Sequence, residues 1–380
     1  METKKSDIVK LLFCGDFIAQ NPQNIKLSAD FKKLLKACDI KCLNFEGSLP
    51  NKNPITIKGT AVLPQSIFSP AWCEENGFNV ISFANNHIGD FGEEALKITK
   101  AAFKSALLVG AGNWDEAYKV EVIEINKIQF GFLSVAQCEF GVLNDNWSNK
   151  NSLGCAWINH CKVNKIIEKA KHSLDIVIVL AHAGIEYYDV PLPEWRDRYK
   201  EMIELGADAI IGSHPHVPQG WELYNGKPIF YSLGNFYFDI ESKRRYWNNG
   251  LTVILNIDEQ RLISFQVINI IKNGNEIIID ESKEIKEHNE GMCHILIDED
   301  GYMKEVNNMC LDLWASYERG FLRALNSEKS SFTIKNVSKY FYSLIKNRKS
   351  EYRFILNFIR CESSRFVISR AIKLLTDVRI

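Results

Sequence analysis

The amino-acid sequence predicts an α/β fold, and three observations support this prediction. Short apolar runs of the kind that form strands alternate with helix-like segments along residues 8–271. One run, residues 175–182, is almost wholly apolar, as expected for a strand whose sheet is covered on both faces. The composition, 46% hydrophobic and 24% charged, is that of a folded chain with a sizeable core. Residues 8–271 are therefore expected to form one domain of packed strands and helices.

The predicted strands are short apolar runs bounded by turn-forming residues. They cover residues 8–14, 41–45, 79–83, 107–109, 119–125, 128–136, 175–182, 208–212, 228–233, 251–257 and 262–271. Only Asn126 and Lys127 separate two of these runs, so a β-hairpin is expected there.

The predicted helices carry apolar residues at a spacing near 3.6. They cover residues 27–37, 70–76, 93–105, 160–171 and 194–205. Gly206 directly follows the last of them, in the position where a glycine commonly ends a helix.

Beyond the α/β domain, residues 272–300 form a polar, acidic connecting stretch with one expected strand, 276–279. Residues 301–380 are predicted to be a basic helical region, because residues 321–380 hold 13 Lys and Arg against 4 Asp and Glu. Its helices are expected to be amphipathic. The apolar stripes are Tyr340, Phe341, Leu344 and Ile345; Phe354, Ile355, Phe358 and Ile359; and Phe366, Val367, Ala371, Leu374 and Leu375.

The composition also argues against several classes of protein. The formal net charge of −1 points to no polyanionic partner, and no nucleic-acid-reading module accompanies the basic region. The ten cysteines form no CxxC pair and are interpreted as packed, reduced thiols. The first apolar run is too short for a signal peptide, and no run is long enough to span a membrane. A cytoplasmic location is the simplest expectation.

Polar side chains gather where the predicted strands end, which is the edge at which an α/β sheet places its active site. Asp16 follows the first strand, after Gly15. Asn44 and Glu46 follow the second strand, and their two-residue spacing puts them on the same side of the chain. If the two strands are neighbours, Asp16 and Glu46 converge. Two converging carboxylates repel each other unless a cation lies between them.

Three later strands also end in polar residues: Asn85, Asn86, His87 and Asp90; His182, Glu186 and Tyr187; and His214 and His216. The last pair is the most specific signal, because Pro215 fixes the backbone between the two imidazoles. Each cluster alone could be a turn, a helix cap or a surface group. Together they predict a metal site. Its expected ligands are Asp16, Glu46, Asn86, His182, His214 and His216.

Imidazoles and carboxylates suit one or two divalent ions of Mn, Zn or Fe. A bound ion lowers the pKa of water from about 15.7 toward 7, which makes water a nucleophile at neutral pH. The sequence therefore predicts a metal-dependent hydrolase.

The clusters occur in a characteristic order. It runs Gly15-Asp16, Asn44-Phe-Glu46-Gly, Ala84-Asn-Asn-His87 with Asp90-x-Gly92, His182-x-Gly184-x-Glu186-Tyr187, Gly212-Ser-His214-Pro-His216-Val-x-Gln219 and Tyr231-Ser-Leu-Gly234-Asn-Phe236. Over residues 8–240 this order resembles the CapA family of poly-γ-glutamate capsule biosynthesis proteins, which is similar to calcineurin-like metallophosphoesterases. The resemblance implies a four-layer α/β/β/α sandwich, here with a helical C-terminal extension, and a metal centre at the strand ends.

The resemblance also implies roles for individual residues. Asp16 and His216 would hold one metal, Asn86, His182 and His214 the other, and Glu46 would bridge them. His87 would be the catalytic acid that protonates a leaving oxygen. Glu186 is a second catalytic candidate, or a partner that orients a ligand histidine. The candidates for substrate contacts, or for loop hydrogen bonds instead, are Asn44, Asn85, Tyr187, Gln219 and Asn235.

The sequence departs from the phosphoesterase pattern at two positions. Ile18 stands where that pattern has a histidine, so the first metal site is poorer in ligands. The bridging carboxylate is Glu46 rather than an aspartate after glycine.

Two functions are therefore expected. The first is hydrolysis of a phosphoester, or a related ester or amide bond, in the biosynthesis of a poly-γ-glutamate-like capsule or cell-surface polymer. The substrate would be an anionic polymer or a phosphorylated small molecule. The second is a non-catalytic scaffold for assembly or export of the polymer, among other capsule synthesis or export proteins. The basic helices could lie on the inner face of a membrane, meet such a partner, or pack on the acidic body.

Overall fold

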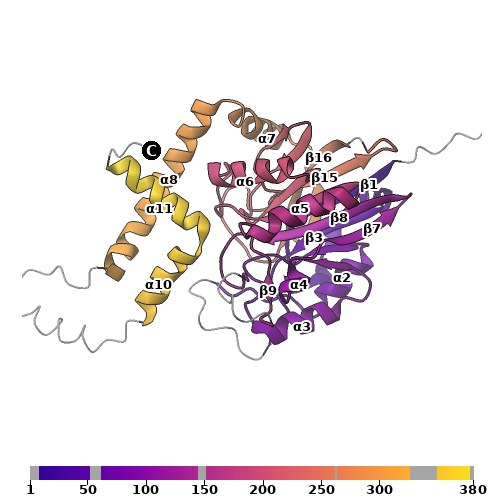
Figure 1. Ribbon diagram of the computed structural model, residues 1–380, viewed down its shortest axis with the longest axis horizontal. Helices are drawn as coiled ribbons and strands as arrows, with labels where there is room; N and C mark the ends of the chain where they lie inside the picture. Colours follow the sequence, from indigo (N-terminus) through magenta and orange to yellow (C-terminus); the bar gives the residue numbers. More distant parts are fainter. Residues whose placement is uncertain (1–7, 52–60, 144–150, 262, 326–348, 377–380) are drawn as a thin grey trace, which may run out of the picture.

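The computed structural model describes residues 8–51, 61–143, 151–261, 263–325 and 349–376, and two β-sheets stacked face to face form its centre (Figure 1). Apolar side chains from both sheets fill the space between them, among them Phe13 and Val253 from one sheet and Phe130, Ile178 and Phe230 from the other. All five are at most 1% exposed. This dry interior explains why the central strands read as nearly continuous apolar runs.

The larger sheet has the strand order β2-β17-β16-β15-β1-β3-β4-β5, with β14 also paired to β1. Its strands are β1 (Val9–Ile18), β2 (Lys26–Leu27), β3 (Ile40–Phe45), β4 (Val80–Ser82), β5 (Leu107–Val109), β14 (Asn235–Phe238), β15 (Asn249–Ile257), β16 (Ile263–Asn273) and β17 (Glu276–Ile279). The strands β14, β1, β3, β4 and β5 run parallel to one another, whereas β15 is antiparallel to both β1 and β16. The carboxyl ends of β1, β3 and β4 therefore meet at one edge.

The smaller sheet has the order β12-β13-β11-β10-β8-β7. Its strands are β7 (Glu121–Ile125), β8 (Ile128–Ala136), β10 (Ile176–His182), β11 (Ala209–Ser213), β12 (Trp221–Tyr224) and β13 (Lys227–Phe230). The predicted hairpin is confirmed between β7 and β8. Asn126 and Lys127 adopt φ of 51° and 64°, as a two-residue hairpin turn requires. A separate two-stranded ribbon joins β6 (Ala111–Gly112) and β9 (Gly154–Cys155).

Helices cover the outer face of each sheet, which confirms the predicted four-layer α/β/β/α sandwich. The larger sheet carries α1 (Ala29–Ala37), α2 (Ser69–Glu75) and α3 (Gly92–Ala102), with a 3₁₀ turn η1 (Pro22–Asn24) near its edge. The smaller sheet carries α4 (Trp114–Ala117), α5 (Cys161–Ser173) and α6 (Pro193–Glu204).

Strand β1 is four residues longer at its carboxyl end than the predicted run of residues 8–14. The extension arises because β14, which is more than 200 residues away in sequence, pairs with it in parallel from Asp16 onward. The register of β1 shifts between Asp16 and Phe17, a β-bulge that re-aims the side chains at this point. Strand β14 itself and strand β12 were not predicted.

The prediction for residues 272–300 was incomplete. Strand β17 matches the expected strand, but it pairs with β16 and so belongs to the larger sheet. Helix α7 (Lys283–Ile295) was missed, because only Ile285 and Asn289 of this mainly polar helix are buried. The boundaries proposed at residues 271 and 300 remain predictions.

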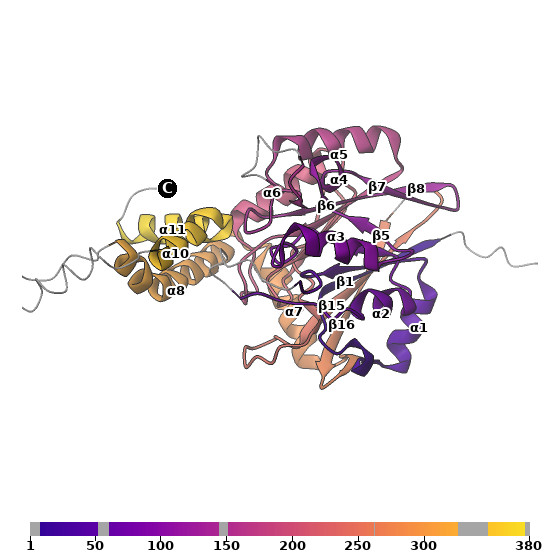
Figure 2. The same ribbon diagram turned by 90° about the horizontal axis from the view of Figure 1, so that it is seen from below.

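The C-terminal region contains α8 (Glu299–Leu325), α10 (Lys349–Arg360) and α11 (Glu362–Leu375), and it projects from one side of the sandwich (Figure 2). The predicted stripe Tyr340, Phe341, Leu344 and Ile345 lies outside the described residues. In the second stripe Phe358 packs on Tyr317 of α8, with ring centroids 4.8 Å apart. In the third, Val367 and Ala371 are fully buried in the core that also contains Trp195 of α6.

Within the described ranges, no helix is both long enough and apolar enough to cross a bilayer.

Candidate metal centre

Strand β1 carries Asp16 near its carboxyl end, and Glu46 directly follows β3. The two carboxylates come together because these strands are neighbours and Asp16 pairs with Asn44 in register. Asp16 and Glu46 are both 0% exposed. Gly15 allows the approach of the next loop, since a Cβ at this position would lie 1.9 Å from the carbonyl oxygen of Gly234. The Asp16 amide in turn donates to that same oxygen at 2.9 Å. A side chain at position 15 would therefore push the two halves of the site apart.

Asp16, Glu46 and His216 form a compact group whose ligand atoms all lie within 4.8 Å of one another. His216 Nδ1 lies 3.3 Å from Asp16 Oδ2, and its Nε2 lies 3.7 Å from Glu46 Oε1. Burial would lower the pKa of His216, but attraction to Glu46 and Asp16 outweighs burial and raises the pKa to about 10. Two buried carboxylates thus favour a positive charge beside them, as a cation-binding donor set must.

A second group of donors surrounds His182. Its Nε2 lies 3.0 Å from Asn86 Oδ1 and 3.0 Å from His214 Nδ1. Donors that share one ion at about 2.0–2.2 Å must themselves be about 3–3.5 Å apart, so these spacings fit a divalent metal. Glu46 Oε1 lies 3.8 Å from His182 Nε2 and joins this group to the first. The structure therefore brings all six predicted ligands to one place.

The histidine loop is held in a strained backbone conformation. His214 and His216 have φ of 99° and 60°, and Tyr187 in the facing loop has φ of 73°. Such left-handed positions cost a residue other than glycine about 1–3 kcal/mol and persist only where neighbours impose them. Here the His214 amide donates to Asp16 Oδ2 at 3.2 Å, and the Tyr187 amide donates to Pro215 O at 2.7 Å. The strain is thus tied directly to the placement of the imidazoles.

His87 and Asp90 form a buried pair beside the metal-type ligands. His87 Nδ1 lies 2.7 Å from Asp90 Oδ2, an oxygen that also accepts from the Leu63 amide. This bond fixes the plane of the imidazole, and His87 Nε2 lies 3.9 Å from Glu46 Oε1. His87 also lines the cavity described below. It is therefore placed to exchange a proton with a group bound there.

Glu186 and Tyr187 line the same cavity. Burial would raise the pKa of Glu186, but attraction to His214 and His216 and a hydrogen bond from Tyr187 outweigh burial and lower the pKa. Glu186 thus stays ionised among the histidines. Burial, followed by the nearby charge of Glu186, raises the pKa of Tyr187, so its hydroxyl stays protonated.

The predicted polar contacts Asn44, Asn85, Asn235 and Gln219 are absent from the described lining of the cavity and lie behind it. Asn44 Nδ2 donates to Asp16 Oδ1 at 2.7 Å, and Asn235 Oδ1 accepts from His216 Nδ1 at 3.0 Å. These two amides orient ligand side chains. Asn85 and Gln219 instead bind backbone oxygens of Phe45 and Tyr188. Only Tyr187, of the five predicted substrate contacts, reaches the cavity.

Ile18, which stands where the phosphoesterase pattern has a histidine, is 0% exposed. It packs in a small apolar cluster with Leu63, Phe238 and Trp247, and Tyr187 covers this cluster. The first ligand group therefore has an apolar neighbour where a further histidine would give it another donor.

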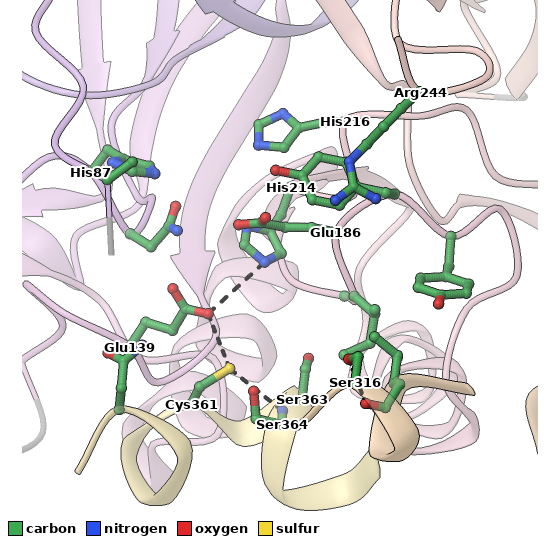
Figure 3. A pocket seen from close by; sticks show the side chains of 18 of the residues that line it. His87, Glu139, Glu186, His214, His216, Arg244, Ser316, Cys361, Ser363 and Ser364 are labelled. Carbon is green, nitrogen blue, oxygen red and sulfur yellow. Dashed lines mark hydrogen bonds and ion pairs between the residues drawn. The ribbon is translucent and has the colours of Figure 1, made fainter. Parts of the chain in front are cut away.

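A cavity of about 790 Å³ opens over the ligand groups (Figure 3). One side is formed by the loops that follow the strands. The other is formed by the C-terminal helices, through Asp312, Leu313, Ser316 and Tyr317 of α8, Asn357 and Phe358 of α10, and Cys361, Ser363 and Ser364 around the start of α11. The sequence reasoning missed this second side, because no motif marks these residues.

Helix α11 is bonded to the site through two buried side chains, Glu362 and Ser363. Ser363 Oγ donates to Gln137 Oε1 at 2.5 Å, and Gln137 Nε2 lies 2.9 Å from His214 Nε2. Glu139 lies between His214 and Cys361 (Figure 3). The thiol of Cys361 donates to Glu139 Oε1, with 3.1 Å between sulfur and oxygen. Gln137 and Glu139 directly follow β8, so their place at a strand end was a signal that the sequence reasoning overlooked.

Fold and site together define a class, a four-layer α/β/β/α protein with a buried histidine–carboxylate centre at the carboxyl ends of its strands. Residues 10–240 match the model of the family described as bacterial capsule synthesis protein PGA_cap. The chain belongs to this family, and the CapA resemblance predicted from the motifs is confirmed.

Two curated relatives are named CapA. The capsule biosynthesis protein CapA of Bacillus anthracis is 37% identical over 174 residues, which is 44% of this chain and 41% of that protein. The PGA biosynthesis protein CapA of Bacillus subtilis is 30% identical over 255 residues, which is 63% of this chain and 66% of that protein. The match thus spans less than half of the first relative and about two thirds of the second.

Solved structures with a similar backbone path include two proteins described as 5′-nucleotidases. The putative enzyme from Staphylococcus aureus has a TM-score of 0.43 at 14% identity, covering 75% of this chain and 58% of that one. The enzyme from Candida albicans has a TM-score of 0.41 at 12% identity, covering 72% and 53%.

Proposed function

We propose that this protein is a metal-dependent hydrolase that acts in the biosynthesis of a poly-γ-glutamate-like capsule or cell-surface polymer. The bond cleaved would be a phosphoester or a related ester or amide. The observation that carries the proposal is the pair of donor groups joined by Glu46, which lie at the base of a cavity large enough for a small substrate. The names of the Bacillus relatives, which refer to capsule and PGA biosynthesis, support the choice of polymer.

In this proposal Asp16 and His216 hold one ion, Asn86, His182 and His214 hold a second, and Glu46 contacts both. Mn, Zn and Fe suit these donors. A bound divalent ion supplies Lewis acidity and makes water acidic enough to be a nucleophile near neutral pH. Asn44 and Asn235 keep the carboxylate and the imidazole of the first group in their orientation.

His87 is the proposed proton donor to the leaving group, because Asp90 fixes its Nδ1 and leaves Nε2 on the cavity side. Glu186 is the second proposed catalytic group, since it is ionised and lies among the histidines. Tyr187 is proposed to contact the substrate. Together these side chains would orient the scissile group and move the proton that its cleavage requires.

The test compares His216→Ala and His214→Ala with His172→Ala, a change of an exposed histidine on α5. Metal content would be measured by mass spectrometry, and hydrolysis with a generic phosphodiester and with γ-glutamyl peptides. We expect near-stoichiometric metal in the wild type and in His172→Ala, and a drop of at least tenfold in the two ligand variants together with loss of turnover. A wild-type protein that binds no metal would refute the proposal.

The alternative function, a non-catalytic scaffold for polymer assembly or export, is favoured by one observation. Ile18 places an apolar side chain beside the first ligand group, which weakens that group as a metal site. The scaffold function predicts that capsule production survives His214→Ala and His216→Ala in folded protein, whereas the hydrolase function predicts that production is lost.

A further inference from the structure

One cation at the cavity lies apart from the ligand groups. Arg244 lines the cavity together with His87, Glu186 and His216 (Figure 3). Its guanidinium lies 3.7 Å from the centre of the Tyr187 ring. Tyr187 in turn stacks on His216, with ring centroids 6.1 Å apart and planes inclined by 29°. Arg244 is therefore the outer member of a stack whose inner member is a proposed metal ligand.

This stack limits where the guanidinium can reach. Tyr187 is fixed by its backbone bond to Pro215, between the two histidines, so the ring that carries Arg244 is tied to the histidine loop. The distance from the guanidinium to the His216 ring cannot exceed the sum of the two stacking distances. The guanidinium therefore lies within about 10 Å of the His216 ring, so a group bound to Arg244 and a group bound at the ligands can belong to one small substrate.

The charge of Arg244 is not neutralised inside the described part of the chain, where no carboxylate lies within 4 Å of its guanidinium. Its neighbour Arg245 differs, because it stacks on Tyr246 and lies 3.7 Å from Glu284. Arg196 is likewise paired, with Glu222 at 2.9 Å. Arg244 is exposed, so an anion from solvent can approach the planar fork of donors that suits carboxylates.

The opposite side of the cavity has the reverse character. Asp312 lines it, with the uncharged Ser316, Ser363 and Ser364, and Glu139 of the loop after β8 lies beside it, bonded to Cys361. Carboxylates there would repel an anionic group of a ligand, whereas the hydroxyls can only donate or accept hydrogen bonds. Glu186 also lines the cavity, but its charge is attracted to His214 and His216. The charged groups together therefore favour one orientation, in which the negative end of the ligand lies toward Arg244.

We propose that Arg244 binds a carboxylate of the substrate and so selects a molecule whose negative charge lies a few bonds from the scissile group. A γ-linked glutamyl unit has this pattern, because four carbon–carbon bonds separate the carbon of its free α-carboxylate from that of its γ-carbonyl. Assigning the ligand as γ-glutamyl rests on the proposed function, whereas the anion-binding role of Arg244 rests on the stack and on its unneutralised charge.

The test is direct binding to the full-length protein, with added divalent metal and after treatment with a chelator, measured by calorimetry. The probes are a short γ-linked glutamate oligomer and the same oligomer with its α-carboxylates converted to amides. We expect the wild type to bind the carboxylate probe at least tenfold more tightly than the amide probe. Arg244→Gln should weaken binding of the carboxylate probe by roughly ten- to hundredfold and leave the amide probe unchanged, because only the charged hydrogen bonds are lost. Arg244→Lys should recover part of the loss.

Arg245→Gln is the matched control, since it removes an adjacent exposed arginine that does not line the cavity. The proposal is overturned if Arg244→Gln binds both probes as the wild type does, or if Arg245→Gln has the same effect. It is also overturned if an alkyl phosphate binds through Arg244 more tightly than the carboxylate probe. Chelator-treated protein has no metal to activate water, so binding to it is measured without turnover. A protein that selects carboxylates through Arg244 but hydrolyses nothing when metal is added would refute the hydrolase and retain this role.

Discussion

The two sides of the cavity differ in how they are built. The side formed by the strand-end loops consists of buried imidazoles and carboxylates within 4 Å of one another, held by a strained backbone and by amide hydrogen bonds. The side formed by α8, α10 and α11 carries hydroxyls, one thiol, aromatic rings and an acid, and it meets the ligand side through few polar bonds. The first side is suited to hold an ion and the second to contact whatever approaches that ion.

The strand-end side is therefore suited to the chemical step, and the helical side to selecting the molecule that reaches it. The ligand side lies within the residues that match the family, 10–240, whereas the helical side lies entirely beyond them. The helical side is nevertheless bonded to a metal-type ligand, because Ser363 contacts Gln137 and Gln137 contacts His214. Three changes test how strongly the two sides depend on each other.

The largest effect is expected from Glu362→Ala. Glu362 is 3% exposed, and its carboxylate accepts from the Cys138 amide, Trp157 Nε1 and Asn159 Nδ2. Its removal leaves three donors without their acceptor, which we expect to cost about 2–4 kcal/mol of the docking of α11. Hydrogen exchange should become faster in α11 while β10 stays protected. Glu318→Ala, at an exposed position on α8, serves as the control. Unchanged exchange in α11 would show that the helix docks by apolar contacts alone.

A smaller effect is expected from Ser363→Ala, which removes the bond to Gln137 and so loosens a partner of His214. Changes behind a metal ligand commonly weaken metal binding by 10–100-fold, and we expect the lower end of that range here. Metal titration of the wild type and the variant would measure it. Ser364→Ala, which also lines the cavity but is bonded to Cys361, should shift the affinity by less than about twofold. Equal effects of Ser363→Ala and Ser364→Ala would mean that α11 covers the cavity but does not influence metal binding through the bond to Gln137.

The smallest effect is expected at the ion pair that joins the sandwich to the start of the helical side. Arg196 contacts Glu222 of β12, the carbonyl oxygen of Leu296, and Glu299 of α8. Burial would raise the pKa of Glu222, but hydrogen bonds from Arg196 and Tyr231 outweigh burial and lower it. A carboxyl whose pKa falls on folding contributes stability above its unfolded pKa, near 4.5, and loses that contribution as the pH falls through the folded value.

We therefore expect Glu222→Gln to lower the free energy of unfolding by about 1 kcal/mol at pH 7, with the difference from the wild type shrinking below pH 4.5. Denaturant unfolding at several pH values would measure it. Glu305→Gln, at an exposed position on α8, should change stability equally little at every pH. A Glu222→Gln deficit that stays constant down to pH 3 would contradict the role of this carboxylate charge.

By itself, the sequence determined the alternation of strands and helices and the members of the metal-type centre, whereas the four layers were implied by the family resemblance. Unbroken apolar runs mark central strands such as β10, whose seven residues are all buried. Ligand-type residues recur at or just after the ends of strands. Asp16, Glu46, His214 and His216 could be selected because a parallel sheet brings the carboxyl ends of its strands to one edge, whatever the length of chain between them. The same rule, applied after β8, would also have selected Gln137 and Glu139.

Only the tertiary structure decided which polar groups face the cavity and which lie behind it. Asn44 of β3 and Asn235 of β14 support ligands, because the group that each amide meets depends on the register shift in β1 and on the pairing of β14 with β1. Arg244, Ser363 and Asp312 carry no local pattern at all. Arg244 is placed by the segment between β14 and β15. Ser363 and Asp312 are placed by the packing of α8 and α11 on the apolar core that also contains α6. That packing is set by apolar contacts between segments far apart in sequence, and such contacts leave no motif in either segment.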